Sequence, residues 1–184
     1  MNPLSDNALM LKVKNGDPDK LGLLFERYNR PLFGFLFHMT GQRELSEDMV
    51  QNVFYRILKY KHTFRGDGEF KTWMYHMARN VVNDNGRLIK RTVKQQELTE
   101  YTTDNTGGGF AADEAIHKKQ ELATLRNAMA NLNEESREIL ILSKFQELKY
   151  SEIAQIMEIS EGAVKVRVHR AIGQLKNMYL QIAN

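Results

Sequence analysis

The stretch Y-S-E-I-A-Q-I-M-E-I-S-E-G-A-V-K-V-R-V-H-R-A at residues 150–171 carries the strongest structural signal in the chain. Apolar side chains recur in it at helical spacing twice, over 153–157 and again from Val164 onward. Ser151 and Ser160 stand where the two helices would need N-caps, and Ile159 and Ser160 occupy the turn. The stretch therefore predicts a helix, a tight turn and a second helix, which is the arrangement that delivers a helix into the DNA major groove.

The second helix of this unit has two distinct sides. One side is an apolar stripe that we expect to be buried, formed by Val164, Val168, Ala171, Ile172, Leu175 and Tyr179. The other side carries Val166, His169 and Arg170, with Lys165 and Arg167 on its flanks. Residues 162–184 hold four basic and no acidic side chains, as expected of a surface that meets phosphates. An ordinary amphipathic helix with a solvated basic face is the alternative, but the capped first helix and the tight turn argue against it.

Charge is distributed unevenly along the 184 residues, although the net charge is only +3. Residues 56–94 hold ten basic and three acidic residues, a net of +7, whereas residues 95–138 hold four basic and nine acidic, a net of −5. A basic block followed by an acidic connector indicates a second nucleic-acid surface, separate from the C-terminal one.

The composition also excludes several classes of site. Cysteine is absent, so the chain has no disulfide, thiolate nucleophile or cysteine-ligated metal site. The N-terminal residues lack a signal-peptide layout and no apolar run is long enough to cross a bilayer, so we expect a soluble cytoplasmic protein. The five histidines are scattered, no H-E-x-x-H, G-x-S-x-G or P-loop spacing occurs, and we expect no catalysis, cofactor, metal or small-molecule substrate.

The remainder of the chain reads as helical. Asp17-Pro18 predicts a helix start, Pro31 a kink or restart, Gly41 an end, and Ser46 the cap of the next helix. Another helix is expected from Phe70. Its apolar side comprises Phe70, Trp73, Met74, Met77, Ala78 and Val81, and its polar side Thr72, Tyr75, His76, Arg79, Asn80 and Asn83.

Periodicity then disappears over a Thr-, Asp- and Gly-rich run that reads as a flexible linker. Helix resumes at about Asp113, and Asn133 is expected to cap a further helix. We therefore predict an all-α protein of two small helical domains, 1–94 and 113–184, joined by a flexible linker at 95–112.

Three segments together resemble a known family. S-E-D-M-V-Q-N-V-F-Y-R-I-L-K (46–59), F-K-T-W-M-Y-H-M-A-R-N (70–80) and the stretch at 150–171 are similar, in the same order, to segments of bacterial RNA polymerase sigma factors of the extracytoplasmic-function type. The resemblance implies a sigma-2 and a sigma-4 domain that attach to the core polymerase, through its beta-prime and beta subunits, and recognise the minus-ten and minus-thirty-five promoter elements.

The resemblance also implies roles for individual residues. Asp48, Gln51 and Tyr55 match the face that docks on the beta-prime clamp helices, although a merely solvated helix face remains the alternative. Arg65 and Gly66 fall in the loop that pockets a flipped minus-ten base. Trp73, Tyr75, Arg79 and Asn80 match the helix beside the separated strand, with Trp73 expected to be a core residue. Lys165, Val166, Arg167, His169 and Arg170 match the minus-thirty-five recognition helix.

Two positions depart from the family's commoner pattern, and both bear on promoter sequence. Val166 stands where a small polar residue is frequent; a valine can pack on a thymine methyl but cannot hydrogen-bond a base edge. His76 stands where arginine is frequent, which weakens one expected phosphate contact. The resemblance further implies an anti-sigma factor, often membrane-bound, as a partner. A stand-alone helix-turn-helix regulator is the alternative function, but residues 1–94 show no βαβ pattern that could provide a sensor domain.

Overall fold

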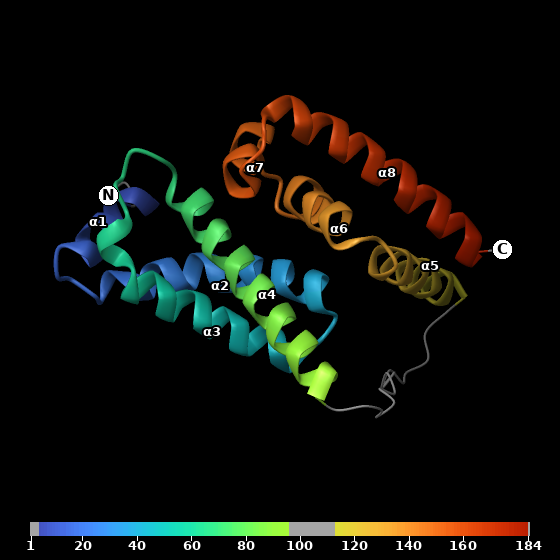
Figure 1. Ribbon diagram of the computed structural model, residues 1–184, viewed down its shortest axis with the longest axis horizontal. Coiled ribbons are helices and arrows are strands. Elements are labelled where there is room, and N and C mark those ends of the chain that lie inside the picture. The colour runs from blue at the N-terminus through green and yellow to red at the C-terminus, as the bar shows by residue number, and fades with distance from the viewer. Residues whose placement is uncertain (1–3, 96–112, 184) are drawn as a thin grey trace.

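A computed structural model describes the backbone of residues 4–95 and 113–183, and the side-chain surroundings of residues 4–86 and 120–183. Within these ranges every regular element is helical, which confirms the all-α prediction (Figure 1). The N-terminal unit comprises α1 (Asp6–Lys14), α2 (Lys20–Thr40), α3 (Arg43–Lys59), the short 3₁₀ turn η1 (Lys61–Thr63) and α4 (Phe70–Gln95). The C-terminal unit comprises α5 (Asp113–Ala130), α6 (Glu134–Leu140), the π-helical turn η2 (Ile141–Phe145), α7 (Tyr150–Met157) and α8 (Glu161–Ala183). The expected flexible linker lies largely at residues 96–112, outside the described residues.

The N-terminal unit packs α2, α3 and α4 side by side, with α1 across one end (Figure 1). Apolar side chains at helical spacing meet in its core, among them Leu24, Phe35, Val53 and Met74. Pro31 lies inside a continuous α2 and so does not restart the helix. Gly41 ends α2 as expected, in the left-handed conformation (φ 71°) that glycine adopts most easily.

Two helix starts in the N-terminal unit differ from the sequence-based expectation. The helix α3 begins at Arg43 with Gln42 as its N-cap, so Ser46 is an interior residue rather than the cap. Its buried hydroxyl donates to the Gln42 carbonyl oxygen at 2.5 Å, which is the back-bonding that serine makes inside a helix. Similarly, α2 begins at Lys20 after Asp19, two residues beyond the Asp17-Pro18 pair.

The C-terminal unit contains the expected helix, turn and helix as α7 and α8. The Ser160 hydroxyl caps α8 by accepting from the Ala163 amide at 3.1 Å, as expected. Ser151, however, lies within α7; the N-cap is Lys149, whose amide donates to the Glu152 carboxylate at 2.6 Å. Glu158 ends α7 in the left-handed conformation (φ 56°) and so makes the turn sharp. Asn133 caps α6, as expected, by accepting from the Ser136 amide at 2.8 Å.

The two units also contact each other. The helix α7 packs against α4, and α6 with η2 packs against α2. The buried side chains of both units form one continuous apolar cluster. In Figure 1, α8 lies on the side of the C-terminal unit that faces away from α4. The fold therefore places the two expected DNA-facing helices in different surroundings, α8 at the surface and α4 partly covered.

Candidate nucleic-acid interface

The exposed side of α8 is formed by residues expected at the minus-thirty-five recognition surface. Lys165, Val166, His169 and Arg170 are exposed, whereas Val164, Val168 and Ala171 on the opposite side are buried. Val166 is 48% exposed although it is apolar, which leaves its methyl groups available to a partner. Arg167 differs from its neighbours because its guanidinium pairs with Glu135 of α6 at 3.3 Å. Ile172, expected in the buried stripe, is 43% exposed instead.

The loop between η1 and α4 surrounds a cavity of about 270 Å³. Arg65 and Gly66 line it from the loop and Trp73 from α4. Gly66 has a φ of 83°, in the left-handed region, so a side chain there would be strained. Trp73 is half-buried and packs on Phe64 with a ring-centroid distance of 5.2 Å, which fits the expectation that it belongs mainly to the core. Three residues expected near the minus-ten element, Arg65, Gly66 and Trp73, thus line one cavity.

The polar side of α4 faces the C-terminal unit. Asn80 is exposed, with its amide 3.5 Å from His76 Nδ1. Tyr75 is only 1% exposed, so its expected place on the polar side of the helix is wrong. Thr72 is also buried, at 8% exposure. Thr72 lies where α7 approaches α4, and Tyr75 lies where Gln146 after η2 does, which the helical period alone cannot reveal because it records only the helix's own sides.

Arg79 of α4 forms an ion pair with a buried carboxylate. Its Nε donates to Glu138 Oε1 of α6 at 3.0 Å, and the side chain of Glu138 is 6% exposed. Burial raises the pKa of Glu138, and the neighbouring Arg79 acts against that rise. The Arg79 side chain, expected to contact DNA, is therefore engaged within the protein.

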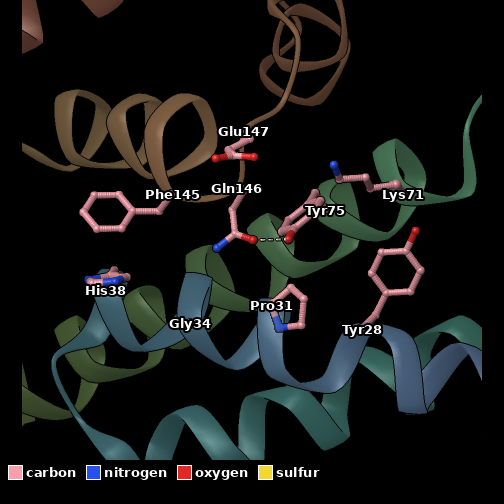
Figure 2. Close-up of a pocket in the computed structure, with 9 residues that line it drawn as sticks. All are labelled: Tyr28, Pro31, Gly34, His38, Lys71, Tyr75, Phe145, Gln146 and Glu147. Carbon is pink, nitrogen blue, oxygen red and sulfur yellow. Dashed lines mark hydrogen bonds between the residues drawn. The ribbon is translucent and has the colours of Figure 1, made fainter.

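Tyr75 is the second polar link between the units, and Figure 2 shows it beside a cavity of about 490 Å³. Its hydroxyl donates to Gln146 Oε1 at 2.5 Å. Burial raises the pKa of Tyr75, so the phenol keeps its proton and remains a donor. On the far side of the same cavity the His38 ring lies against Phe145, with a centroid distance of 4.4 Å.

The polar side of α3 is open to solvent. Asp48, Gln51 and Tyr55 are all exposed, and Tyr55 is 63% exposed despite its aromatic ring. An adjacent hollow of about 430 Å³ is lined by residues of α2 and α3, including Phe25, Phe33 and Gln51. A large exposed ring beside an apolar hollow is typical of a protein-docking surface.

Two family models match the chain in the order that its helices predict. The sigma-70 region 2 model matches residues 24–92, and the sigma-70 region 4 model matches residues 122–175. The RNA polymerase sigma factor YlaC of Bacillus subtilis (strain 168) is 30% identical over 163 residues, which is 86% of this chain and 91% of that protein. The chain belongs to the extracytoplasmic-function sigma factors of the sigma-70 family. It directs RNA polymerase to promoters, and sigma factors are not themselves enzymes.

Further relatives agree with this assignment. The extracytoplasmic-function sigma factor SigX of B. subtilis is 30% identical over 157 residues, covering 84% of this sigma factor and 80% of SigX. Among solved structures, CnrH in complex with the cytosolic domain of CnrY has a TM-score of 0.71 at 21% identity and covers 94% of this chain and 96% of CnrH. RpoE with the anti-sigma factor NepR from Bartonella quintana has a TM-score of 0.69 at 21% identity, covering 85% and 94%. These two structures show that the fold is shared.

The described helices of this sigma factor include none with the length and apolarity that a bilayer crossing demands. Three residues of the C-terminal unit whose side chains bond to α4 were not expected from the sequence, namely Glu138, Gln146 and Glu158. One signal for Glu138 was present, since it directly precedes the run I-L-I-L and thus adjoins a buried segment. Gln146 and Glu158 carry no such signal, because both lie in or beside turns whose direction the sequence does not define.

Proposed function

We propose that this sigma factor divides a promoter between its two units. The exposed side of α8 is the observation that carries the proposal: Lys165 and Arg170 offer cations, and His169 a hydrogen-bonding ring, to phosphates and base edges around Val166. Arg167 completes this minus-thirty-five surface when it leaves Glu135. Arg65 and Gly66 of the loop cavity, with Trp73, Tyr75, Arg79 and Asn80 of α4, form the minus-ten surface. Tyr75 and Arg79 take part in it only when they release Gln146 and Glu138. A further part of the proposal is that residues 1–94 form the sigma-2-like domain, 95–112 the linker and 113–184 the sigma-4-like domain.

The core polymerase supplies most of the free energy of promoter opening. DNA stacking contributes about 1.4 kcal/mol per base-pair step, so separating about ten pairs costs on the order of 14 kcal/mol. A base held in the loop cavity recovers only about 1–3 kcal/mol by stacking. The sigma factor therefore selects and holds an unstacked base, and the polymerase provides the remaining contacts. The exposed side of α3, with Asp48, Gln51 and Tyr55, is the proposed contact with the beta-prime clamp helices.

An anti-sigma factor is the proposed negative regulator, and the cytoplasm the proposed location. Support comes from two solved proteins of the same fold, CnrH in complex with the cytosolic domain of CnrY and RpoE in complex with the anti-sigma factor NepR. A partner of this kind would compete with core polymerase for the same exposed helices.

Run-off transcription with purified core polymerase on a promoter library tests the proposal. We expect selective initiation with the wild-type chain, and weak promoter binding by the chain without core enzyme. Tyr55→Ala should weaken the binding of core polymerase without unfolding α3, because the ring is 63% exposed. Glu44→Ala, an exposed change on the same helix, is the control. Equal promoter affinity with and without core enzyme would contradict the proposed division of labour.

A further inference from the structure

The polar side of α4 meets the C-terminal unit over successive helical turns. Tyr75 donates to Gln146 of the segment after η2, Arg79 pairs with Glu138 of α6, and His76 Nε2 lies 3.3 Å from Glu158 Oε1 at the end of α7. Glu158 adopts the left-handed conformation that ends α7, so the turn fixes the position of its backbone beside His76.

The loop cavity is covered from the same direction. Among the described residues, Gln155 of α7 is the one part of its lining that comes from the C-terminal unit. Beside it, the loop residues Asp67, Gly68 and Glu69 share a second, polar hollow with the first turn of α7. A nucleic-acid strand lying along α4 and entering the loop cavity would therefore collide with α7.

The part of the C-terminal unit that covers α4 presents negative charge, as a nucleic-acid strand would. Residues 56–94 carry a net charge of +7, and residues 95–138, which include Glu138, carry −5. Within the contact, the carboxylate of Glu138 lies against Arg79 and that of Glu158 against His76. The phosphates of a bound strand would occupy similar positions beside these two side chains.

Two contacts outside the minus-ten surface hold the units in this register. Arg137 Nη1 of α6 donates to the Met39 carbonyl oxygen of α2 at 3.1 Å. The His38 ring of α2 packs against the Phe145 ring of η2. Val166 and His169 of α8 are exposed and take no part in these contacts.

We propose that the free chain closes on itself, with α6 and α7 acting as an internal substitute for the minus-ten strand. Closure and strand binding are then mutually exclusive, and the two units must separate before a melted strand can reach α4. The minus-thirty-five surface is accessible in both forms. The inference goes beyond the proposed function, since it requires no anti-sigma factor, although the identity of the displaced strand rests on that function.

The charge pair provides a specific test on the full-length free chain. Because the chain has no cysteine, donor and acceptor dyes can be attached to Glu44→Cys in α3 and Asn177→Cys in α8, both exposed positions. Energy transfer is then measured in the parent, in Glu138→Arg, in Arg79→Glu and in the double variant with the charges exchanged. Glu121→Arg, an exposed charge reversal in α5, is the matched control.

Each single variant places like charges together in a buried contact, so the ratio of closed to open molecules should fall by roughly tenfold or more. The exchanged pair should restore energy transfer to near the parent value, which no general loss of folding would do. Glu121→Arg should leave it unchanged. A parent chain that is already open, or single variants that match the control, would overturn the inference.

A single-stranded oligonucleotide of a cognate minus-ten sequence provides the second readout. The free Glu138→Arg chain should bind it more tightly than Glu121→Arg, which adds the same charge elsewhere. Opening without a gain in binding would overturn the claim that closure competes with the strand. Run-off transcription, measured separately, tests the proposed function. If the chain closes and the exchanged pair restores closure, but no variant supports initiation, then the promoter role is wrong and the closure still holds.

Discussion

Arg79 and Glu138 are 59 positions apart in the sequence, yet the guanidinium Nε of one lies 3.0 Å from the carboxylate of the other. The glutamate is almost fully buried, and burial raises the pKa of its carboxyl while Arg79 opposes the rise. The contact thus joins α4 to α6, and removing either charge leaves the other without its partner.

Removing the arginine should destabilise the chain in a pH-dependent way. In Arg79→Ala the buried carboxylate loses its cation, so we expect a loss on the order of 3 kcal/mol near neutral pH. The pKa of Glu138 then rises further. A carboxyl whose folded pKa exceeds its unfolded value costs no stability below the unfolded pKa and costs more as pH rises toward and through the folded pKa. The deficit of the variant should therefore shrink as the pH is lowered from 7 towards 4.

Thermal unfolding of both chains at several pH values measures this deficit. Arg43→Ala serves as the control, because its pair with Glu47 is exposed and should contribute less than about 1 kcal/mol. A deficit for Arg79→Ala that stays constant with pH would show that the carboxylate is not the group responsible.

Alkaline pH should weaken the wild-type chain partly through Tyr75. Burial raises the pKa of this phenol, whereas in the unfolded chain it ionises near its ordinary value of about 10. Its contribution to stability is therefore fully present below about pH 10 and is lost as the pH rises above that value. Tyr75→Phe removes the bond to Gln146, at a cost of about 1 kcal/mol near neutral pH, and also removes this alkaline loss.

Urea unfolding between pH 8 and pH 11 separates the two effects of Tyr75→Phe. The stability curves of variant and wild type should converge as the pH increases. Tyr28, whose pKa is also raised by burial and by its hydrogen bond to Asp6, remains in both chains and gives a common background. Parallel curves would mean that Tyr75 does not titrate differently in the folded state.

The element types and the organisation into two units follow from residue periodicity, because each helix buries one apolar side. Helix starts were less predictable, and the serines explain why. Ser160 caps α8, whereas Ser46 and Ser151 lie inside α3 and α7, and Ser46 shows that a serine near a helix start can bond back into the helix instead of capping it. Contacts between units were not predictable at all. The helical period of the sequence places Tyr75 on the polar side of α4, but the folded chain buries it, because the C-terminal unit covers that side.

Capping therefore provides a matched pair of substitutions. Ser160→Ala removes the acceptor of the Ala163 amide and should cost about 1 kcal/mol of folding free energy. Ser151→Ala should change the stability by no more than a few tenths of a kcal/mol, because Ser151 is exposed within α7 and the α7 start is capped by Glu152. Chemical denaturation of both variants measures the difference, and equal losses would place a cap at Ser151 as well.

Val166 should contact the methyl group of a thymine rather than hydrogen-bond to a base edge. Its side chain is 48% exposed between Lys165 and Arg170 on the proposed minus-thirty-five surface. Only thymine presents a methyl group in the major groove, so replacing one thymine of the minus-thirty-five element by uracil should weaken binding of the polymerase complex several-fold. Val166→Ser should bind both templates alike, because it lacks the apolar partner for that methyl. Binding measured on templates with each thymine replaced in turn locates the contact, and a wild-type complex indifferent to every replacement would exclude it.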